Sequence, residues 1–117
     1  MGSDMPIELT ETPVGVTKAN LSGRIDVANI PAIESSLQKA AEAGRAMLID
    51  LSAVDFIASL GLRTLIKCAR TMSHKQGRLA LLSPRPAVAE IIEISGIEEL
   101  IPVYHTEAEA IAFVSPA

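Results

Sequence analysis

Ser59 is the residue whose type and position in this chain most suggest chemistry. It lies between an apolar run at residues 47–51 and a segment with helical periodicity, where a strand-to-helix connection ends. A serine at a helix start can accept a hydrogen bond from a free backbone N–H of the first turn, and position alone favours this capping role. A hydrolase would need a base to activate the hydroxyl, and the sequence offers no evident partner for it.

The carboxylates give a second set of candidates. Asp50 and Asp55 flank Ser52, an arrangement that could serve catalysis but more often caps turns. Asp26 follows a Ser-Gly-Arg turn signal, where it either ends the turn or contacts a partner, and position alone does not separate the two roles.

The remaining reactive side chains predict no catalysis. His74 and His105 lack partners at metal-ligand spacing, which favours surface or polar packing roles. Cys68 lies beside an apolar helical stripe and is predicted to be partly buried rather than reactive. Neither G-x-x-x-x-G-K nor G-x-G-x-x-G occurs. We therefore predict no catalytic residue, no metal site and no cofactor.

A buried strand and a long helix must position Ser59. Residues 47–51 are apolar except at Asp50, as in a strand that is covered on both faces. The helix that follows carries an apolar stripe and ends near Gly77; the stripe comprises Leu62, Leu65, Ile66, Ala69 and Met72. Gly61 falls in its first turn, where the missing side chain lets another backbone or a ligand come close.

The N-terminal third predicts two strands and a helix. Residues 7–12 and 14–21 alternate in the manner of strands, and residues 22–24 then turn the chain. Because Pro31 is tolerated only in a first turn, the next helix must begin close to Asn29, and it ends at Gly44.

The C-terminal third predicts two further strands and two helices. Residues 79–82 and 101–104 are the strands. One helix has its apolar face between Val88 and Ser95 and stops at Gly96. The last helix opens on a capping box of Thr106 with Glu109 and runs through Phe113.

This alternation indicates an α/β fold with a mixed, largely parallel sheet of about five strands and about four helices. The first strand is expected to pair antiparallel with the second. The 117 residues are expected to form a single domain. Residues 1–4 are interpreted as an expression remnant before Met5, and residues 115–117 as a frayed tail.

Composition excludes several classes of function. The chain is 49% hydrophobic but only 3% aromatic, so its core is built from Leu, Ile, Val and Ala. With a net charge of −4 and no basic run, nucleic acid and anionic membrane surfaces are not expected partners. No apolar run approaches the roughly 20 residues of a membrane span, and no signal peptide is visible. A single cysteine fits a reducing compartment, and we expect a cytoplasmic protein.

The segment LIDLSAVDFIASLGLRTLI closely resembles the signature of STAS domains, the small modules typified by anti-sigma-factor antagonists. In that family a strand precedes an Asp-Ser-Ser/Thr-Gly-Leu turn, and a partner kinase phosphorylates the first serine. The resemblance implies that Ser59 is the phosphoacceptor, followed by Gly61 and Leu62. Ala58 stands where antagonists usually have aspartate, and Leu60 where they have serine or threonine.

The segment LSGRIDVANIPAIESSL resembles the same family, in which Gly-x-x-Asp precedes the first helix, here Gly23 and Asp26. In the family fold the first two connections to helices lie at one end of the sheet. The resemblance therefore implies one partner-binding patch formed by Gly23, Asp26, Asn29, Ala58, Leu60, Gly61 and Arg63. Leu60 would be an unusually apolar contact on that patch.

Two functions from different classes follow from the resemblance. In the first, the chain is a bacterial, non-enzymatic regulator of transcription, monomeric when free. It binds an anti-sigma factor serine kinase when unphosphorylated and is released when Ser59 is phosphorylated, which is partner switching. In the second, it is a STAS subunit that docks on a lipid or anion transporter component without phosphorylation. The retained Ser59 favours the first and Ala58 favours the second. A third, weaker interpretation is a nucleotide-binding domain with slow hydrolysis.

Overall fold

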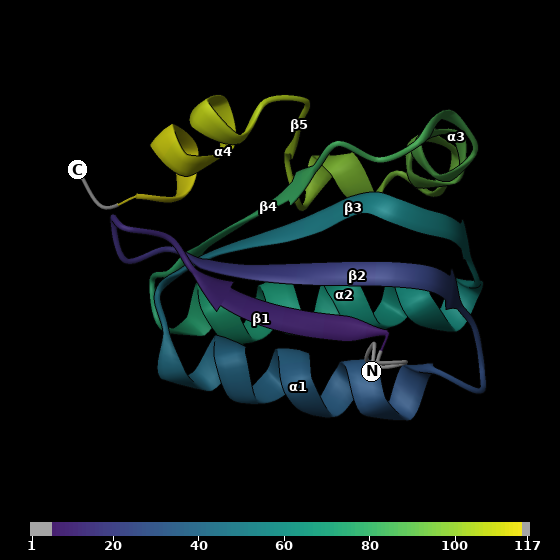
Figure 1. Ribbon diagram of the computed structural model, residues 1–117, viewed down its shortest axis with the longest axis horizontal. Helices are drawn as coiled ribbons and strands as arrows, with labels where there is room; N and C mark the ends of the chain where they lie inside the picture. The colour runs from purple at the N-terminus through teal and green to yellow at the C-terminus, as the bar shows by residue number, and fades with distance from the viewer. Residues whose placement is uncertain (1–5, 116–117) are drawn as a thin grey trace, which may run out of the picture.

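The structure, a computed structural model, describes residues 6–115 and contains one five-stranded sheet. Strands β1 and β2 pair antiparallel, and every later pair is parallel. The strands follow one another across the sheet in chain order (Figure 1): β1 (Ile7–Glu11), β2 (Thr17–Ile25), β3 (Ala46–Ile57), β4 (Arg78–Leu82) and β5 (Val103–Tyr104). The predicted mixed, largely parallel sheet is confirmed.

Four α-helices and one short 3-10 helix connect and cover the strands: α1 (Ile30–Ala43), α2 (Ser59–His74), α3 (Pro86–Ser95), η1 (Ile97–Glu99) and α4 (Glu107–Val114). Helices α1, α2 and α3 share one core cluster with strand residues such as Ile49 and Leu81. Helix α4 packs with Leu48 and Leu82 on the opposite face. In Figure 1, α1 and α2 lie side by side on one side of the sheet and α4 on the other.

The core is aliphatic, as the composition predicts. Both clusters consist mainly of Ile, Leu, Val, Ala and Met side chains. Tyr104 and Phe113 lie at the margin of the smaller cluster, with ring centroids 5.8 Å apart. Within residues 6–115, no helix combines the length and the apolar character that crossing a bilayer requires.

Two predicted boundaries of β2 are wrong. The strand begins at Thr17, because Val14 lies in a tight turn closed by the Gly15 N–H donating to the Thr12 carbonyl at 3.1 Å. Residues 22–24 do not turn the chain: they continue β2, with a register shift after Gly23, whose φ is +77°. A glycine tolerates this conformation, so the turn signal marks a bulge inside a paired strand.

Strand β3 is longer than the predicted strand at residues 47–51, since it runs to Ile57. The polar residues after Leu51 occupy mostly exposed positions while pairing with β2 continues to the strand end. Asp50 Oδ1 accepts a hydrogen bond from the Ser52 N–H at 2.9 Å, close to another register shift. This carboxylate therefore stabilises an irregular strand rather than a turn.

The helix signals were more reliable. Helix α1 begins directly after Asn29, has Pro31 in its first turn and ends before Gly44. Helix α3 stops at Gly96, which has φ 76°. Thr106 Oγ1 accepts from the Glu109 N–H at 3.3 Å, which confirms the cap of α4. Strand β5 covers only residues 103–104 of the predicted four. The predictions for residues 1–4 and for residues 116–117 of the tail lie outside the described chain. Ser115, also part of the tail predicted to be frayed, is the C-cap of α4, and its N–H donates to the Ile111 carbonyl at 2.9 Å.

Lys75 ties the C-terminus of α1 to the end of α2. Its ammonium donates to the carbonyls of Ala41 at 2.9 Å and Gly44 at 2.8 Å, and also to that of Glu42. A cation at a helix C-terminus interacts favourably with the helix dipole. Lys75→Met should therefore lower the free energy of unfolding by about 1–2 kcal/mol. Urea unfolding would compare this variant with Lys39→Met, a matched change at an exposed position. Equal unfolding midpoints for the two variants would show that the hydrogen bonds of Lys75 contribute nothing to stability.

Candidate functional site

The ends of β2 and β3 bring the two predicted site segments together. Ile25 pairs with Ile57, and the Ala58 N–H donates to the Ile25 carbonyl at 2.9 Å. The chain then leaves β2 for α1 and leaves β3 for α2 at the same end of the sheet. Residues 23–29 and 58–63 therefore lie at one end of the molecule, as predicted.

Ser59 is the first residue of α2 and not its cap, so the capping prediction is wrong. Ala58 occupies the N-cap position with extended backbone, φ −83° and ψ 164°. Alanine has no polar side chain, and in the described chain no side-chain hydrogen bond caps the first turn of α2. The Ser59 side chain is exposed. Its hydroxyl thus stands at a helix N-terminus that an external anion or a modification can approach.

Gly61 lies beneath this loop rather than on its surface. It is buried, and a Cβ added to it would lie 2.8 Å from Ile25 Cγ2 and 2.8 Å from Ile57 Cγ1. The first turn of α2 can pack on the ends of both strands only because this residue has no side chain. Gly61 thereby sets the position of Ser59 and Leu60. It belongs to the predicted patch only as a buried residue beneath the surface, not as a contact on it.

The turn before α1 is held by its own polar groups. The Asp26 carbonyl accepts from the Asn29 N–H at 3.0 Å and from the Ile30 N–H at 2.9 Å. Asn29 Nδ2 donates to the Arg24 carbonyl at 2.6 Å. The backbone of Asp26 therefore closes the turn, which is one of its two predicted roles.

The side-chain carboxylate of Asp26 makes fewer hydrogen bonds than its backbone carbonyl. One carboxylate oxygen lies 3.4 Å from Arg24 Nε, and the other, Oδ1, is buried without a hydrogen-bond partner in the described chain. The Arg24 guanidinium lies over the Phe56 ring, 4.5 Å from its centroid. Arg24, which is exposed, and Phe56, which is half-buried, therefore form a cation–π pair at the edge of the predicted patch.

A shallow hollow opens next to Ser59 along α2. It has a volume of about 410 Å³ and is lined by Ser59, Leu62, Arg63, Ile66, Lys67 and Arg70. Leu60, which is 45% exposed, lies in the chain between the lining residues Ser59 and Leu62. Sequence reasoning placed Ser59, Leu60 and Arg63 on the patch but missed Ile66, Lys67 and Arg70. Their spacing of 3, 4 and 7 residues from Arg63 puts them on the same helix face and could have indicated them.

The other sequence candidates do not gather into a site. Asp55 pairs with Arg85, whose Nε also donates to the Ser52 carbonyl at 2.8 Å, so this carboxylate is joined to the loop before α3. Burial raises the pKa of the Cys68 thiol to about 11, so it stays protonated and unreactive near neutral pH. Among residues 6–115, no three His, Cys, Asp or Glu side chains come together as metal ligands would.

Comparison with known proteins identifies a family with this arrangement. The model of the STAS domain matches residues 9–110. The chain belongs to the STAS family. BtrV of Bordetella bronchiseptica, a STAS relative named as an anti-sigma factor antagonist, is 37% identical over 101 residues, which are 85% of this chain and 87% of BtrV.

Solved structures agree with the fold of this STAS domain. The crystal structure of an anti-sigma factor antagonist from Mycobacterium paratuberculosis has a TM-score of 0.80 and 30% identity, covering 97% of this chain and 98% of that one. The murine anion transporter Slc26a9 contains a similar fold, with a TM-score of 0.72 and 18% identity over 86% of this chain and 18% of the transporter. The predicted STAS membership and fold class are thus confirmed, and the transporter shows the fold alone.

Proposed function

We propose that this STAS domain is an anti-sigma factor antagonist that binds an anti-sigma factor serine kinase through the Ser59 end of its sheet. Binding requires an unphosphorylated Ser59, and phosphorylation of Ser59 releases the partner. The observation that carries the proposal is the exposed Ser59 hydroxyl at the N-terminus of α2, beside an exposed Leu60 and the residue 23–29 connection.

The relatives support the general class. Two proteins that are at least 30% identical to this chain are named anti-sigma factor antagonists. Their alignments cover 85% and 97% of the chain. The two proteins also match the chain along most of their own length, 87% and 98%.

The chemistry of the site supports the switch. A phosphoserine carries about −1.5 to −2 charges, and a helix N-terminus stabilises an anion through its free N–H groups and dipole. Arg63 is exposed one turn further along α2, at the spacing of a helical side-chain pair. The fold should therefore accept the phosphate, so that the cost falls on a partner packed against Ser59.

Phosphorylation of Ser59 is the direct test. The full chain would be incubated with Mg-ATP and each anti-sigma serine kinase of its source organism, and the phosphate located by peptide mass spectrometry. We expect label on Ser59 alone and none in Ser59→Ala. Label on another serine, with Ser59 unmodified, would contradict the proposal.

Leu60 offers a test of the binding surface. An apolar side chain of this size is worth roughly 1.5–3 kcal/mol when a partner buries it fully. Leu60→Asp should therefore weaken kinase binding at least tenfold, which corresponds to about 1.4 kcal/mol. The melting temperature should hardly move, since Leu60 is already 45% exposed.

The matched control for this change is Leu100→Asp, because Leu100 is 64% exposed and follows η1, outside the two segments of the predicted patch. It should leave kinase binding intact. A large loss of stability in Leu60→Asp would instead show that this leucine belongs to the core.

A second function, docking on a transporter component without phosphorylation, is favoured by one residue. Ala58 replaces the aspartate usual in antagonists and occupies the N-cap position directly before Ser59. If no kinase labels Ser59 while Leu60→Asp still abolishes binding to a transporter subunit encoded beside this gene, this second function replaces the first.

A further inference from the structure

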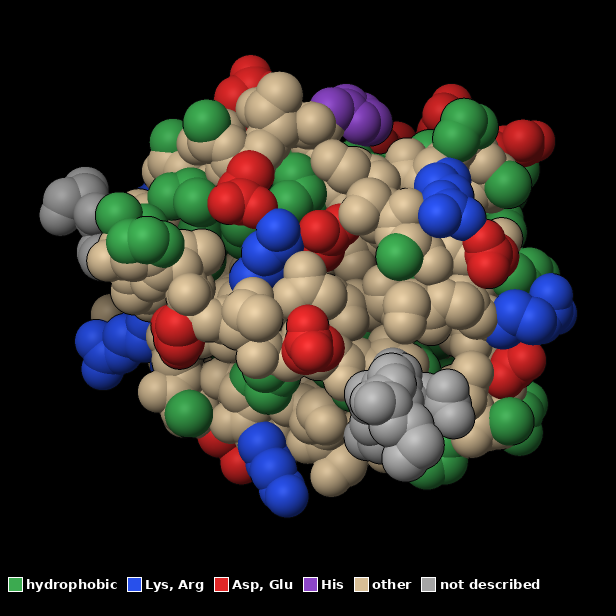
Figure 2. Space-filling view, viewed as in Figure 1, with side chains coloured by type: hydrophobic (Ala, Val, Ile, Leu, Met, Phe, Trp, Pro, Cys, Tyr) green, Lys and Arg blue, Asp and Glu red, His purple; other side chains and the backbone are tan. Residues whose placement is uncertain are grey.

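Charge is unevenly distributed along this acidic chain. Helix α2 carries Arg63, Lys67 and Arg70 but no Asp or Glu, in a protein with a net charge of −4. The last quarter of the chain contains no Lys or Arg. Its acidic residues are Glu90, Glu93, Glu98, Glu99, Glu107 and Glu109. On the face shown in Figure 2, by contrast, acidic and basic side chains are interspersed.

The basic residues of α2 border an apolar floor. Arg63, Lys67 and Arg70 follow one another at the i, i+4 and i+7 spacing of a single helix face. On one side of this row, Leu62 and Ile66 are only partly buried and line the same hollow. We call this surface, defined by Leu62, Arg63, Ile66, Lys67 and Arg70, the α2 groove. Ser59 lies at its N-terminal end.

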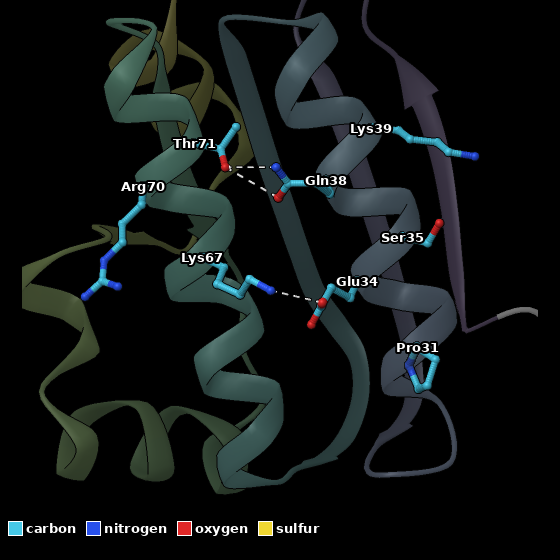
Figure 3. A pocket seen from close by; sticks show the side chains of 8 residues that line it. All are labelled: Pro31, Glu34, Ser35, Gln38, Lys39, Lys67, Arg70 and Thr71. Atoms are coloured by element: carbon cyan, nitrogen blue, oxygen red, sulfur yellow. Dashed lines mark hydrogen bonds and ion pairs between the residues drawn. The ribbon is translucent and has the colours of Figure 1, made fainter.

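The α2 groove continues into a wider hollow between α1 and α2. That hollow has a volume of about 800 Å³ and also includes Lys67 and Arg70. Figure 3 shows that Lys67 reaches across to Glu34, with Nζ 3.1 Å from Oε1, and that Gln38 and Thr71 bridge the helices further along. Arg70 points away from α1. The two helices are thus already joined, and the open side of the groove is the side of Arg70.

Two of the three cations are available to an external acid. In the described chain, Arg63 and Arg70 have no carboxylate within 4.0 Å, whereas Lys67 is paired and its side chain is still 55% exposed. A guanidinium binds a carboxylate through two parallel hydrogen bonds, which a lysine cannot do. The groove therefore presents two unoccupied carboxylate-binding groups about two helical turns apart.

We propose that the α2 groove binds an acidic amphipathic helix of the partner protein, with carboxylates on Arg63 and Arg70 and apolar side chains on Leu62 and Ile66. Arg63 and Arg70, the outer two of the three cations, lie seven residues apart, or about 10 Å along the axis, which two turns of a facing helix match. The inference deepens the proposed function, because the same partner would contact Ser59. A phosphate on Ser59 would then compete with the partner's carboxylates for Arg63.

Other occupants fit less well. Three cations in an acidic chain fall short of the clusters of about four to eight that recruit anionic lipids. A second copy of the chain could offer its own acidic residues Glu90 and Glu93 beside Ile94, which is 79% exposed. That occupant is an outcome of the experiment below.

The probe is a synthetic 14-residue helical peptide with leucines on one face and glutamates beside them, titrated into the unphosphorylated full chain. A matched peptide carries glutamine for each glutamate. We expect NMR shifts concentrated on residues 59–70, binding by the glutamate peptide at least tenfold tighter than by the glutamine peptide, and weakening of binding by salt. Arg63→Gln/Arg70→Gln should lower the affinity at least tenfold.

Arg45→Gln/Arg78→Gln, which removes the same charge at the opposite end of the parallel strands, where the Arg78 N–H donates to the Arg45 carbonyl, should leave affinity within twofold. Equal binding of both peptides, equal effects of both double variants, or shifts away from α2 would overturn the inference. So would concentration-dependent dimers in sedimentation that Arg63→Gln/Arg70→Gln abolishes, since the groove would then belong to a second copy.

The inference and the proposed function can fail separately. The peptide titration needs no kinase, so it can succeed even if Ser59 is never phosphorylated. If the kinase binds the Arg70→Gln chain with unchanged affinity while Ser59→Asp loses binding, the proposed function stands and the groove inference falls.

Discussion

Replacing Ser59 by aspartate is expected to weaken binding to the anti-sigma kinase by nearly three orders of magnitude. A like charge about 4 Å away costs on the order of 4 kcal/mol at an effective dielectric of 20, and each 1.4 kcal/mol is a factor of ten in affinity. Ser59 is exposed in the first turn of α2, where a carboxylate suits the helix dipole, so the fold itself should not suffer. Ser59→Ala should bind like the wild type.

Calorimetry against the kinase would rank the wild type, Ser59→Ala and Ser59→Asp, and NMR would locate the effect of each change in the free protein. Shifts confined to the residues around Ser59 would indicate local electrostatics and shape. Shifts spread across the sheet would reveal a conformational switch instead. Equal binding by all three proteins would favour the docking subunit that needs no phosphorylation.

Gly61→Val is expected to lower the free energy of unfolding by about 3 kcal/mol, the upper part of the range for overpacking. The Cβ alone would lie 2.8 Å from methyl or methylene carbons of Ile25 and Ile57, both almost fully buried. The branched methyl groups of valine add to that conflict, and the better helix propensity of valine offsets only a few tenths of a kcal/mol. Denaturant unfolding would measure the loss.

Arg63→Val is the matched control for this change, since it places the same side chain on an exposed position of the same helix. It should cost only a few tenths of a kcal/mol. If the Gly61→Val protein unfolds with the wild-type midpoint, the ends of β2 and β3 yield more readily than the packing indicates, and Gly61 does not fix the Ser59 loop.

The elements that local signals define were predicted well from the sequence. Pro31 and Gly44 bracket α1, and Gly96 ends α3, because each acts on the backbone of its own neighbourhood. The two wrong turns, near Gly23 and Ser52, have another origin. Their small polar residues resemble turns locally, but parallel pairing between β2 and β3 carries both segments as irregular strand. The sequence of either segment alone does not predict pairing between segments so far apart in the chain.

The candidate site divides in the same way. The exposure of Ser59 and Leu60 follows from the motif and its place after a strand. The burial of Gly61 depends on how closely Ile25 and Ile57 approach α2, which only the packed structure reveals. The sequence places Arg70 off the apolar stripe of α2, and only the structure shows that this residue lines the same hollow as Ser59.

Each strand of the sheet pairs only with the strands that precede and follow it in the chain. A nascent polypeptide therefore always finds the neighbour of its newest strand already synthesised, and no strand must later be inserted between two others. Each of these closures is shorter than one that spans intervening strands, but every parallel pair must first bring together strands separated by a connecting segment such as α1 or α2. Because β2, β3 and the start of α2 all precede residue 64, the complete Ser59 end of the sheet would leave the ribosome before β4 does. A kinase or competing partner could thus meet its target on a chain whose last third is still being translated.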